Sequence, residues 1–265
     1  MILRQTQDKN SKNGERRRTM KLMTHMVVGY PSIPATIDIV KTMAAQGVDY
    51  IELQIPFSDP LADGPTIMKA CENSLANGTK VKDTFFIAEK LSSEIDTPLL
   101  FMAYFNTVFR YGVETFCKDA KSAGVSGLIV PDMPIDEERE EHFYEACRNN
   151  HLNTIQVVSP ASTDRRLKKN VKVAKGFVYA TAHQGITGAK DRLNPHFASY
   201  LKRLRNFFSI PIAVGFGISK REHLQLLAPH ADIAVVGSAI IEVIHSSKKE
   251  SIEKNVKNFI KGLMI

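Results

Sequence analysis

Several features that mark other protein classes are absent from this 265-residue chain. It has no tryptophan and only three cysteines, Cys71, Cys117 and Cys147, with no CxxC pair among them. An odd number of widely spaced cysteines is typical of buried small hydrophobic side chains in a reducing compartment. No apolar run reaches the roughly 18 residues that a membrane helix needs, and the N-terminus lacks the apolar core of a signal peptide. These absences predict a cytoplasmic protein without a membrane anchor.

The short motifs of several enzyme classes are missing as well. No GxGxxG follows the first predicted strand, which weakens a doubly wound dinucleotide-binding sheet as the fold. The eight histidines are scattered without an HExxH motif, so we expect no metal site, and no GxSxG nucleophile elbow is present. The segment 185–190, Gly-Ile-Thr-Gly-Ala-Lys, has the wrong spacing for a phosphate-binding P-loop.

The net charge of +7 is unevenly distributed along the chain. Residues 1–21 carry a net charge of +5, which leaves an ordinary +2 for the remainder. A basic tail of this composition is usually a solvated, disordered extension, so the charge does not predict a nucleic-acid-binding protein. We therefore divide the chain into a basic extension over 1–21 and a single catalytic domain over 22–265.

The pattern of that domain is an alternation of short apolar strands and amphipathic helices, without a linker or a shift in composition. This order predicts an α/β fold, a single TIM (β/α)8 barrel with extra helical segments. The long stretches after the third and sixth strands, including 103–112 and 181–190, are interpreted as loops. The eight predicted strands cover 22–29, 50–55, 97–102, 127–130, 154–158, 176–180, 210–214 and 233–236.

The second strand and the loop after it carry the most informative residues. Ile51, Leu53 and Ile55 alternate with polar neighbours, so Glu52 should point to the inner face of the barrel. A buried carboxylate is costly unless it is paired or used, and the alternative for Glu52 is a structural ion pair. A second carboxylate, Asp63, lies on the loop that leaves the same strand, and two acids in different environments can divide acid–base roles.

Further polar and glycine residues follow the other strands. Active sites of such barrels lie at the C-terminal ends of the strands, where Tyr104 and Tyr179 are expected. Glycine loops follow strands six, seven and eight, at 185–188, 215–217 and 237–238. Their N–H groups, with those of the helices beyond, can form an anion site. Three converging loops predict a phosphate-bearing ligand.

The motif IELQIPFSDPLADGPTI at 51–67 resembles the signature of the tryptophan synthase α subunit family. FMAYFNTVFRYG, LIVPDMP, GITG, GFGIS and VVGSAI extend the similarity over roughly 22–245. The resemblance implies a carbon–carbon lyase of tryptophan biosynthesis, which cleaves indole-3-glycerol phosphate to indole and glyceraldehyde 3-phosphate. It also implies no cofactor on this chain, and a β subunit that binds pyridoxal phosphate in an α2β2 heterotetramer.

The same resemblance implies residue roles. Glu52 would transfer the proton to and from the indole ring carbon, and Asp63 would accept the indole N–H and stabilise the developing positive charge. The other implied positions bind phosphate or line the pocket. They are Tyr104, Tyr179, Phe216, Gly188, Gly217, Gly237 and Ser238. Asp59, Asn106 and Asp132 would lie near the rim that faces the β subunit.

Two positions depart from the family pattern. Gln54 stands where glycine is commonest, and His183 stands where arginine is common in the loop after strand six. Gln54 either orients Glu52 or fills substrate space, and orientation is favoured because a buried amide without partners is costly. Two other functions stay open: a catalytically weak subunit that mainly activates the β subunit, and another phosphate-binding barrel enzyme.

Overall fold

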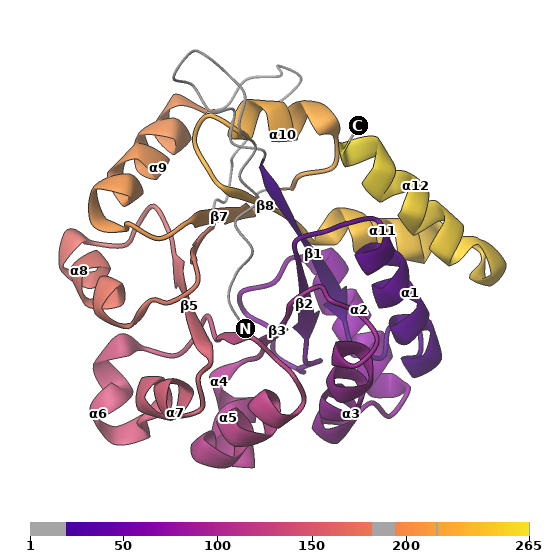
Figure 1. Cartoon of the computed structure of the whole chain (residues 1–265), viewed down its shortest axis with the longest axis horizontal. Coiled ribbons are helices and arrows are strands. Elements are labelled where there is room, and N and C mark those ends of the chain that lie inside the picture. Colours follow the sequence, from indigo (N-terminus) through magenta and orange to yellow (C-terminus); the bar gives the residue numbers. More distant parts are fainter. Residues whose placement is uncertain (1–19, 182–193, 216, 265) are drawn as a thin grey trace.

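The computed structural model describes residues 20–181, 194–215 and 217–264, and these form a closed barrel of eight parallel strands (Figure 1). Each strand pairs with the next along the chain, and β8 pairs with β1 to close the barrel. The predicted (β/α)8 barrel is therefore confirmed. The strands are β1 Lys21–Val27, β2 Tyr50–Gln54, β3 Leu99–Met102, β4 Gly127–Ile129, β5 Asn153–Val158, β6 Val178–Thr181, β7 Ile212–Gly215 and β8 Ile233–Val236.

Alternating residues of each strand build two separate apolar layers. Ile51, Leu53 and Ile55 belong to the large layer between the strands and the helices. A smaller cluster, which includes Met23 of β1, Leu100 of β3 and Ala213 of β7, fills the interior of the barrel. The side chains of Glu52 and Gln54 point to this inner side, as the period-two alternation predicted. Polar side chains on the inner face of the strands therefore lie close together inside the barrel.

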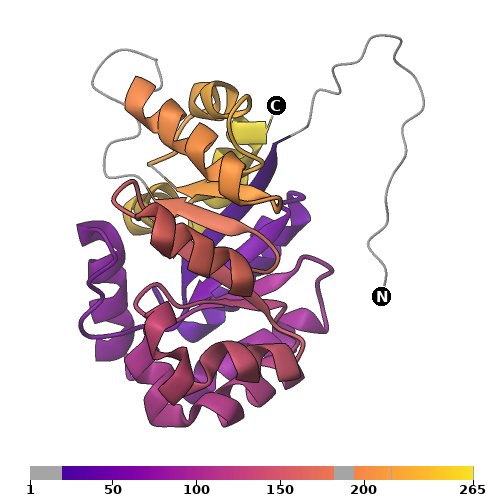
Figure 2. The same ribbon diagram turned by 90° about the vertical axis from the view of Figure 1, so that its left-hand side faces the viewer.

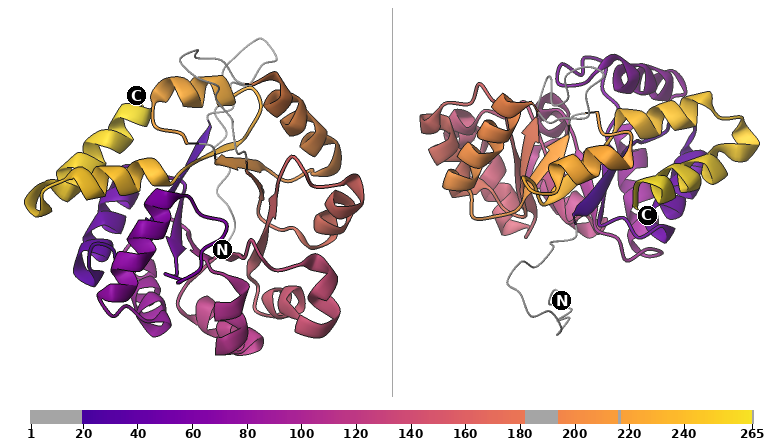
Figure 3. Two further views of the ribbon diagram at one scale, coloured as in Figure 1. Left: turned by 180° about the vertical axis from the view of Figure 1, so that it is seen from behind. Right: turned by 90° about the horizontal axis from the view of Figure 1, so that it is seen from above.

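The helices form a ring outside the strands, as the end-on and side views show (Figures 1, 2 and 3). The last helices lie beside the first, since α12 packs on both α1 and α11. The helices are α1 Ile33–Ala45, α2 Pro65–Ala76, α3 Val81–Ser92, α4 Phe105–Tyr111, α5 Val113–Ser122, η1 Ile135–Glu137, α6 Glu138–Glu141, α7 Phe143–Asn149, α8 Asp164–Val173, α9 Pro195–Phe207, α10 Arg221–Leu227, α11 Ser238–Ser246, η2 Lys249–Ser251 and α12 Ile252–Met264.

One segment that the sequence assigned to a loop is a helix. Residues 105–111, after β3, form α4, which begins after Tyr104 and ends at Gly112. Val108 is fully buried, and Phe105 packs edge-on against Phe143 at 6.1 Å between ring centroids. The segment is short and its apolar residues cover less than two helical turns, so packing rather than periodicity makes it helical.

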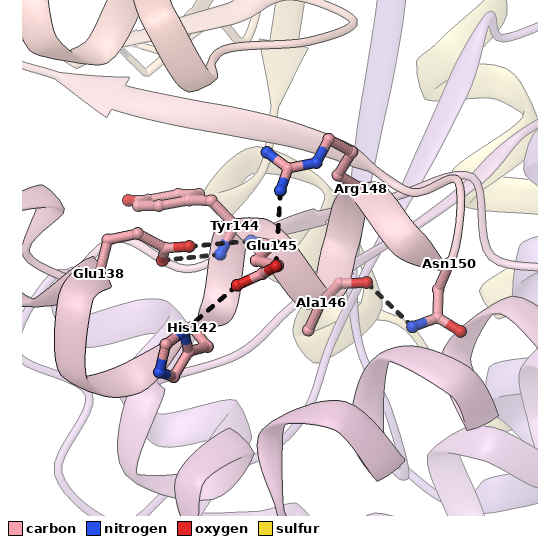
Figure 4. Close-up of polar contacts among 7 residues, drawn as sticks. All are labelled: Glu138, His142, Tyr144, Glu145, Ala146, Arg148 and Asn150. Atoms are coloured by element: carbon pink, nitrogen blue, oxygen red, sulfur yellow. Dashed lines mark hydrogen bonds and ion pairs between the residues drawn. The ribbon is translucent and has the colours of Figure 1, made fainter.

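A second difference concerns the charged helix predicted over 136–149. The chain forms η1, α6 and α7 there, with a break at His142, whose φ of 51° is left-handed. The Glu138 carboxylate accepts hydrogen bonds from the N–H groups of Tyr144 and Glu145, at 2.8 Å each (Figure 4). A carboxylate that satisfies two free N–H groups stabilises the start of α7, so a new helix begins after the break.

The three cysteines are buried and free, in agreement with their interpretation as small hydrophobic side chains. Among the helices that the structure describes, none is long and apolar enough to cross a bilayer. Residues 1–19 of the predicted N-terminal extension lie outside the described residues, and Lys21 is the first residue of β1.

Candidate active site

The centre of the site is a pair of side chains from adjacent strands. His25 of β1 and Glu52 of β2 are partners in the register of the two strands, so both project into the barrel. Nδ1 of His25 lies 3.2 Å from Oε2 of Glu52, and each residue is only 4% exposed. The Nε2 atom of His25 is buried and has no hydrogen bond of ordinary geometry within the described residues.

The carboxylates around His25 determine its charge. Burial alone would lower the pKa of His25, because it disfavours the charged imidazolium. The charge and hydrogen bond of Glu52, the charge of Asp63 and the Gln54 side chain together outweigh burial, so the pKa of His25 is raised. The surroundings of His25 therefore favour the protonated imidazole.

The second carboxylate, Asp63, is held by two donors at one oxygen. Gln54 donates from Nε2 to Oδ2 at 2.6 Å, and the Tyr104 hydroxyl donates to the same atom at 2.9 Å. The Tyr104 hydroxyl also accepts the N–H of Ala62 at 2.9 Å, which ties the loop before Asp63 to the barrel. The prediction that Gln54 orients Glu52 is wrong in its target, because the Gln54 amide donates to Asp63 instead.

The environment of Asp63 differs from that of Glu52. Burial raises the pKa of Asp63, against the opposing effects of His25 and of the hydrogen bonds from Gln54 and Tyr104. Phe57 stacks on Tyr104 with 5.1 Å between ring centroids, which fixes the tyrosine that carries the bond. The site therefore presents one carboxylate paired with a histidine and another held by neutral donors, a difference that allows separate roles.

A pocket opens over these groups at the C-terminal ends of the strands. Its polar lining includes His25, Glu52, Asp63, Tyr179 and Gly237. Most of the remaining lining is apolar and comes from Ala62, Ile67, Met102, Ile129, Pro131, Val157 and Val235. An apolar pocket with a few converging polar groups suits a flat aromatic ligand that carries a polar substituent.

Tyr179 forms one wall of this pocket. Its hydroxyl lies where a side chain on Gly215 would begin, 2.5 Å from an ideal Cβ position, so a glycine is required there. Burial, together with the charges of Glu52 and Asp63, raises the pKa of Tyr179 well above its usual value. Tyr179 therefore stays a neutral phenol beside the two acids.

The glycine segments after β7 and β8 lie at the same end of the barrel. Gly217 has φ of +75°, a left-handed conformation that favours glycine. Gly237 precedes α11, and Ser238 is its first residue, so the free N–H groups of the first turn of α11 begin beside the pocket. Such a helix start favours a bound anion.

Comparison with known proteins agrees with this geometry. The family model for the tryptophan synthase alpha chain matches residues 11–263. The tryptophan synthase alpha chain of Desulfotalea psychrophila is 43% identical over 87% of this chain and 90% of its own length. That of Petrotoga mobilis is 38% identical over 92% and 95%. The chain belongs to the tryptophan synthase α chain family.

Solved structures of tryptophan synthases share the fold. A chain of the α2β2 complex from Pyrococcus furiosus is 33% identical and superposes with a TM-score of 0.86, over 93% of this chain and 99% of its own. A tryptophan synthase chain from Mycobacterium tuberculosis is 31% identical, with a TM-score of 0.83 over 94% and 93%.

Of the residues that the sequence singled out, the structure brings several together. Glu52, Asp63, Tyr179 and Gly237 line one pocket, and Tyr104 is bonded to Asp63. Gly217 and Ser238 are near the same end of the barrel but do not line this pocket. Gly188 and Phe216, like His183, lie outside the described residues.

Sequence reasoning missed His25 altogether. A single histidine in an apolar strand carries no motif, and the strand is buried on both sides, so its alternation is not visible. The one available signal was that His25 lies two residues after Met23, so that the two side chains share the inner side of β1. In this member of the tryptophan synthase α chain family, His25 is the third ionisable side chain of the site, after Glu52 and Asp63. It contacts Glu52 directly.

Proposed function

We propose that this chain is the α subunit of a tryptophan synthase and cleaves indole-3-glycerol phosphate to indole and glyceraldehyde 3-phosphate. The observation that carries the proposal is the pair of carboxylates, Glu52 and Asp63, in one apolar pocket next to a helix start that suits phosphate. The cleavage is a retro-aldol reaction, which needs proton transfer and charge stabilisation but no redox step.

Glu52 carries the proton in this proposal. The carbon–carbon bond breaks when the indole ring carbon gains a proton and the neighbouring glycerol hydroxyl loses one. A single carboxyl group on the inner side of β2 can do both in turn, because the two positions are adjacent in the substrate. Its contact with His25 limits the freedom of the side chain before the substrate binds.

Asp63 stabilises the intermediate. Protonation of the ring carbon places positive charge on the indole nitrogen, and a carboxylate that accepts its N–H lowers the energy of that state. The bonds from Gln54 and Tyr104 both end on Oδ2, so Oδ1 remains to accept the indole N–H. Tyr179 forms the wall against which the ring lies.

The phosphate is held at the other end of the substrate. The N–H groups at the start of α11, the Ser238 hydroxyl and the backbone around Gly217 supply donors there, with Gly188 and Phe216 proposed to complete the subsite. Binding energy from a group remote from the reacting bond can orient the substrate over Glu52.

The proposed partner is a tryptophan synthase β subunit, in an α2β2 complex. The pyridoxal phosphate is proposed to belong to β, since the reaction assigned to this chain needs proton transfer only. Asp59, Asn106 and Asp132 are proposed to lie at the facing rim, and Asp132 already accepts the N–H of Phe105 at 2.8 Å. The three free cysteines fit a cytoplasmic location for this complex.

The decisive test is Glu52→Gln, assayed by release of glyceraldehyde 3-phosphate with and without the β subunit. A positioned acid–base group contributes about 10²–10⁴ in rate. The cleavage rate of the variant should therefore fall at least about a hundredfold, while its melting temperature stays close to that of the parent chain. The unsubstituted chain should cleave faster when β is added. If Glu52→Gln kept the parent rate, the proposed chemistry would be excluded.

A further inference from the structure

The acid–base group of the proposed reaction has a titratable partner. Glu52 does not stand alone in an apolar pocket, because Nδ1 of His25 is 3.2 Å from Oε2 and both side chains are almost fully buried. Without a titratable neighbour, a carboxyl group binds and loses its proton alone. Beside an imidazole, the proton instead belongs to the pair.

We infer that His25 and Glu52 act as one proton-holding unit, in which His25 stores the proton that Glu52 delivers to the indole ring. This inference rests on the proposed function and deepens it. It makes His25 a positioning residue that works through Glu52.

The step balances within the pair. At rest the unit holds one proton, on the imidazolium, and Glu52 is a carboxylate. When Glu52 takes that proton through Oε2 and passes it to the ring carbon, His25 is left neutral. As the carbon–carbon bond breaks, the adjacent hydroxyl becomes a carbonyl and gives its proton to Glu52, which returns it to His25. No other reactant is needed.

The surroundings of His25 support a stored positive charge. From β2 it faces Glu52 and Gln54, and from the loop beyond it faces Asp63, all of which favour the protonated imidazole. Tyr179 of β6 lines the same pocket and stays neutral. From the side of β8, Gly237 presents no charged side chain, and an ideal Cβ there would lie 3.6 Å from the His25 Cβ. Among the described residues that line the pocket, His25 is the only basic side chain.

His25 also lies between Glu52 and the start of α11, where the phosphate is proposed to bind. It contacts Glu52 on one side and lies against Gly237, where α11 begins, on the other. The buried Nε2 atom has no hydrogen bond of ordinary geometry in the described chain, so it remains able to bind a substrate oxygen or water.

The test compares two substitutions in the chain saturated with β subunit. His25→Asn keeps an N–H donor near the position of Nδ1 but has no titratable proton, whereas His25→Phe keeps the ring volume and loses both. In the parent chain kcat/KM should follow a bell-shaped pH profile, whose alkaline limb is set by loss of the shared proton. Without His25 the proton must reside on a carboxyl group, which ordinarily loses it near pH 4–5.

We expect the alkaline limb to move down by about one pH unit or more in both variants, with at least about a tenfold loss of kcat at pH 8 and a smaller loss at pH 6. KM should change less than kcat, because the phosphate subsite is untouched. A parent-like alkaline limb in His25→Asn overturns the inference, even if His25→Phe is impaired, since asparagine removes only the proton.

A control variant and a second measurement complete the test. His245 contacts the Tyr30 hydroxyl outside the pocket, so His245→Asn should leave the profile unchanged. If the His25 variants do not fold, nuclear magnetic resonance of the imidazoles still decides, because His25 should titrate at a lower pH in Glu52→Gln than in the parent chain. Equal titration of His25 in both chains overturns the inference.

The two proposals fail in different ways. Loss of cleavage in Glu52→Gln together with a parent-like pH profile in His25→Asn would overturn this inference alone, whereas full cleavage in Glu52→Gln would overturn the proposed function.

Discussion

Gln54 and Asp63, nine positions apart, are joined by a hydrogen bond of 2.6 Å from the amide Nε2 to the carboxylate Oδ2. The bond connects the last residue of β2 to the loop that follows it. The Gln54 side chain is completely buried, and its Oε1 atom has no hydrogen bond of ordinary geometry within the described residues. Gln54 therefore restrains the loop that carries the second acid of the site.

The first prediction concerns this bond. Gln54→Leu keeps similar volume and removes the donor, so Asp63 loses one of its two partners. We expect kcat/KM to fall about tenfold, the equivalent of about 1.4 kcal/mol for a bond to a charged group. Gln156→Leu is a matched control, because Gln156 is buried on β5 and contacts the Tyr144 hydroxyl instead. A higher kcat/KM in Gln54→Leu would mean that Gln54 crowds the substrate.

A pair of tyrosines provides the second prediction. The hydroxyls of Tyr104 and Tyr111 each donate to an aspartate, at 2.9 Å to Asp63 and at 2.7 Å to Asp119. Tyr104→Phe should lower kcat/KM about tenfold and destabilise the chain by about 1 kcal/mol, since the Ala62 N–H also loses its acceptor. Tyr111→Phe should change stability only. Equal kinetic losses in the two variants would show that the effect is not local to Asp63.

The third prediction follows from the raised pKa of Asp63. Burial raises its folded pKa above the ordinary 3.8, so the folded chain holds this proton more tightly than the unfolded chain. The protonated Asp63 carboxyl therefore stabilises the folded chain relative to the unfolded chain below pH 3.8. This contribution is lost as the pH rises through the folded pKa of Asp63. Asp63→Asn avoids that loss, because an amide is neutral at every pH.

The melting temperature of Asp63→Asn relative to the parent should therefore increase from about pH 4 to about pH 7. Cleavage should fall at least tenfold in the same variant, because a neutral amide stabilises positive charge less well. Thermal melts at several pH values, with Asp119→Asn as the control for a carboxylate outside the pocket, measure this. If the difference in melting temperature between Asp63→Asn and the parent shrinks as the pH rises, the predicted direction is wrong.

The fourth prediction separates two glycines of the proposed phosphate subsite. Gly217 has a left-handed φ, so Gly217→Ala should cost about 1 kcal/mol of stability. An alanine at Gly237 would meet its nearest atoms at 3.6 Å or more, which is ordinary contact, so Gly237→Ala should leave the melting temperature nearly unchanged. Both should raise KM more than they lower kcat. If Gly237→Ala changed kcat alone, the phosphate role of this position would be refuted.

The sequence predicted the parts of the site that depend on periodicity. Alternation along β2 was enough to place Glu52 and Gln54 on the inner side of the barrel, and the strand ends were enough to gather Asp63 and Tyr179 near them. It did not predict the contact between His25 and Glu52, because that depends on the register of two strands whose residues are buried on both faces.

Loop geometry was the other limit. Gln54 and Asp63 are nine positions apart, and only the folded loop, with Phe57 stacked on Tyr104, brings the amide to the carboxylate. The same limit applies to α4, where the contacts of Val108 and Phe105 with distant residues decide for a helix. Short segments of this kind are determined by tertiary packing more than by local sequence.

The pairing of β1 with β8 has a consequence for the order in which the chain becomes functional during synthesis. The N–H of Lys21 bonds to the carbonyl of Asp232 at 2.9 Å, so the barrel closes through residues at opposite ends of the domain. His25, Glu52 and Asp63 leave the ribosome early, whereas Gly237 and Ser238 leave near the end. The growing chain therefore carries both acids long before it carries the proposed phosphate-binding residues, and no partly made chain has the complete proposed site.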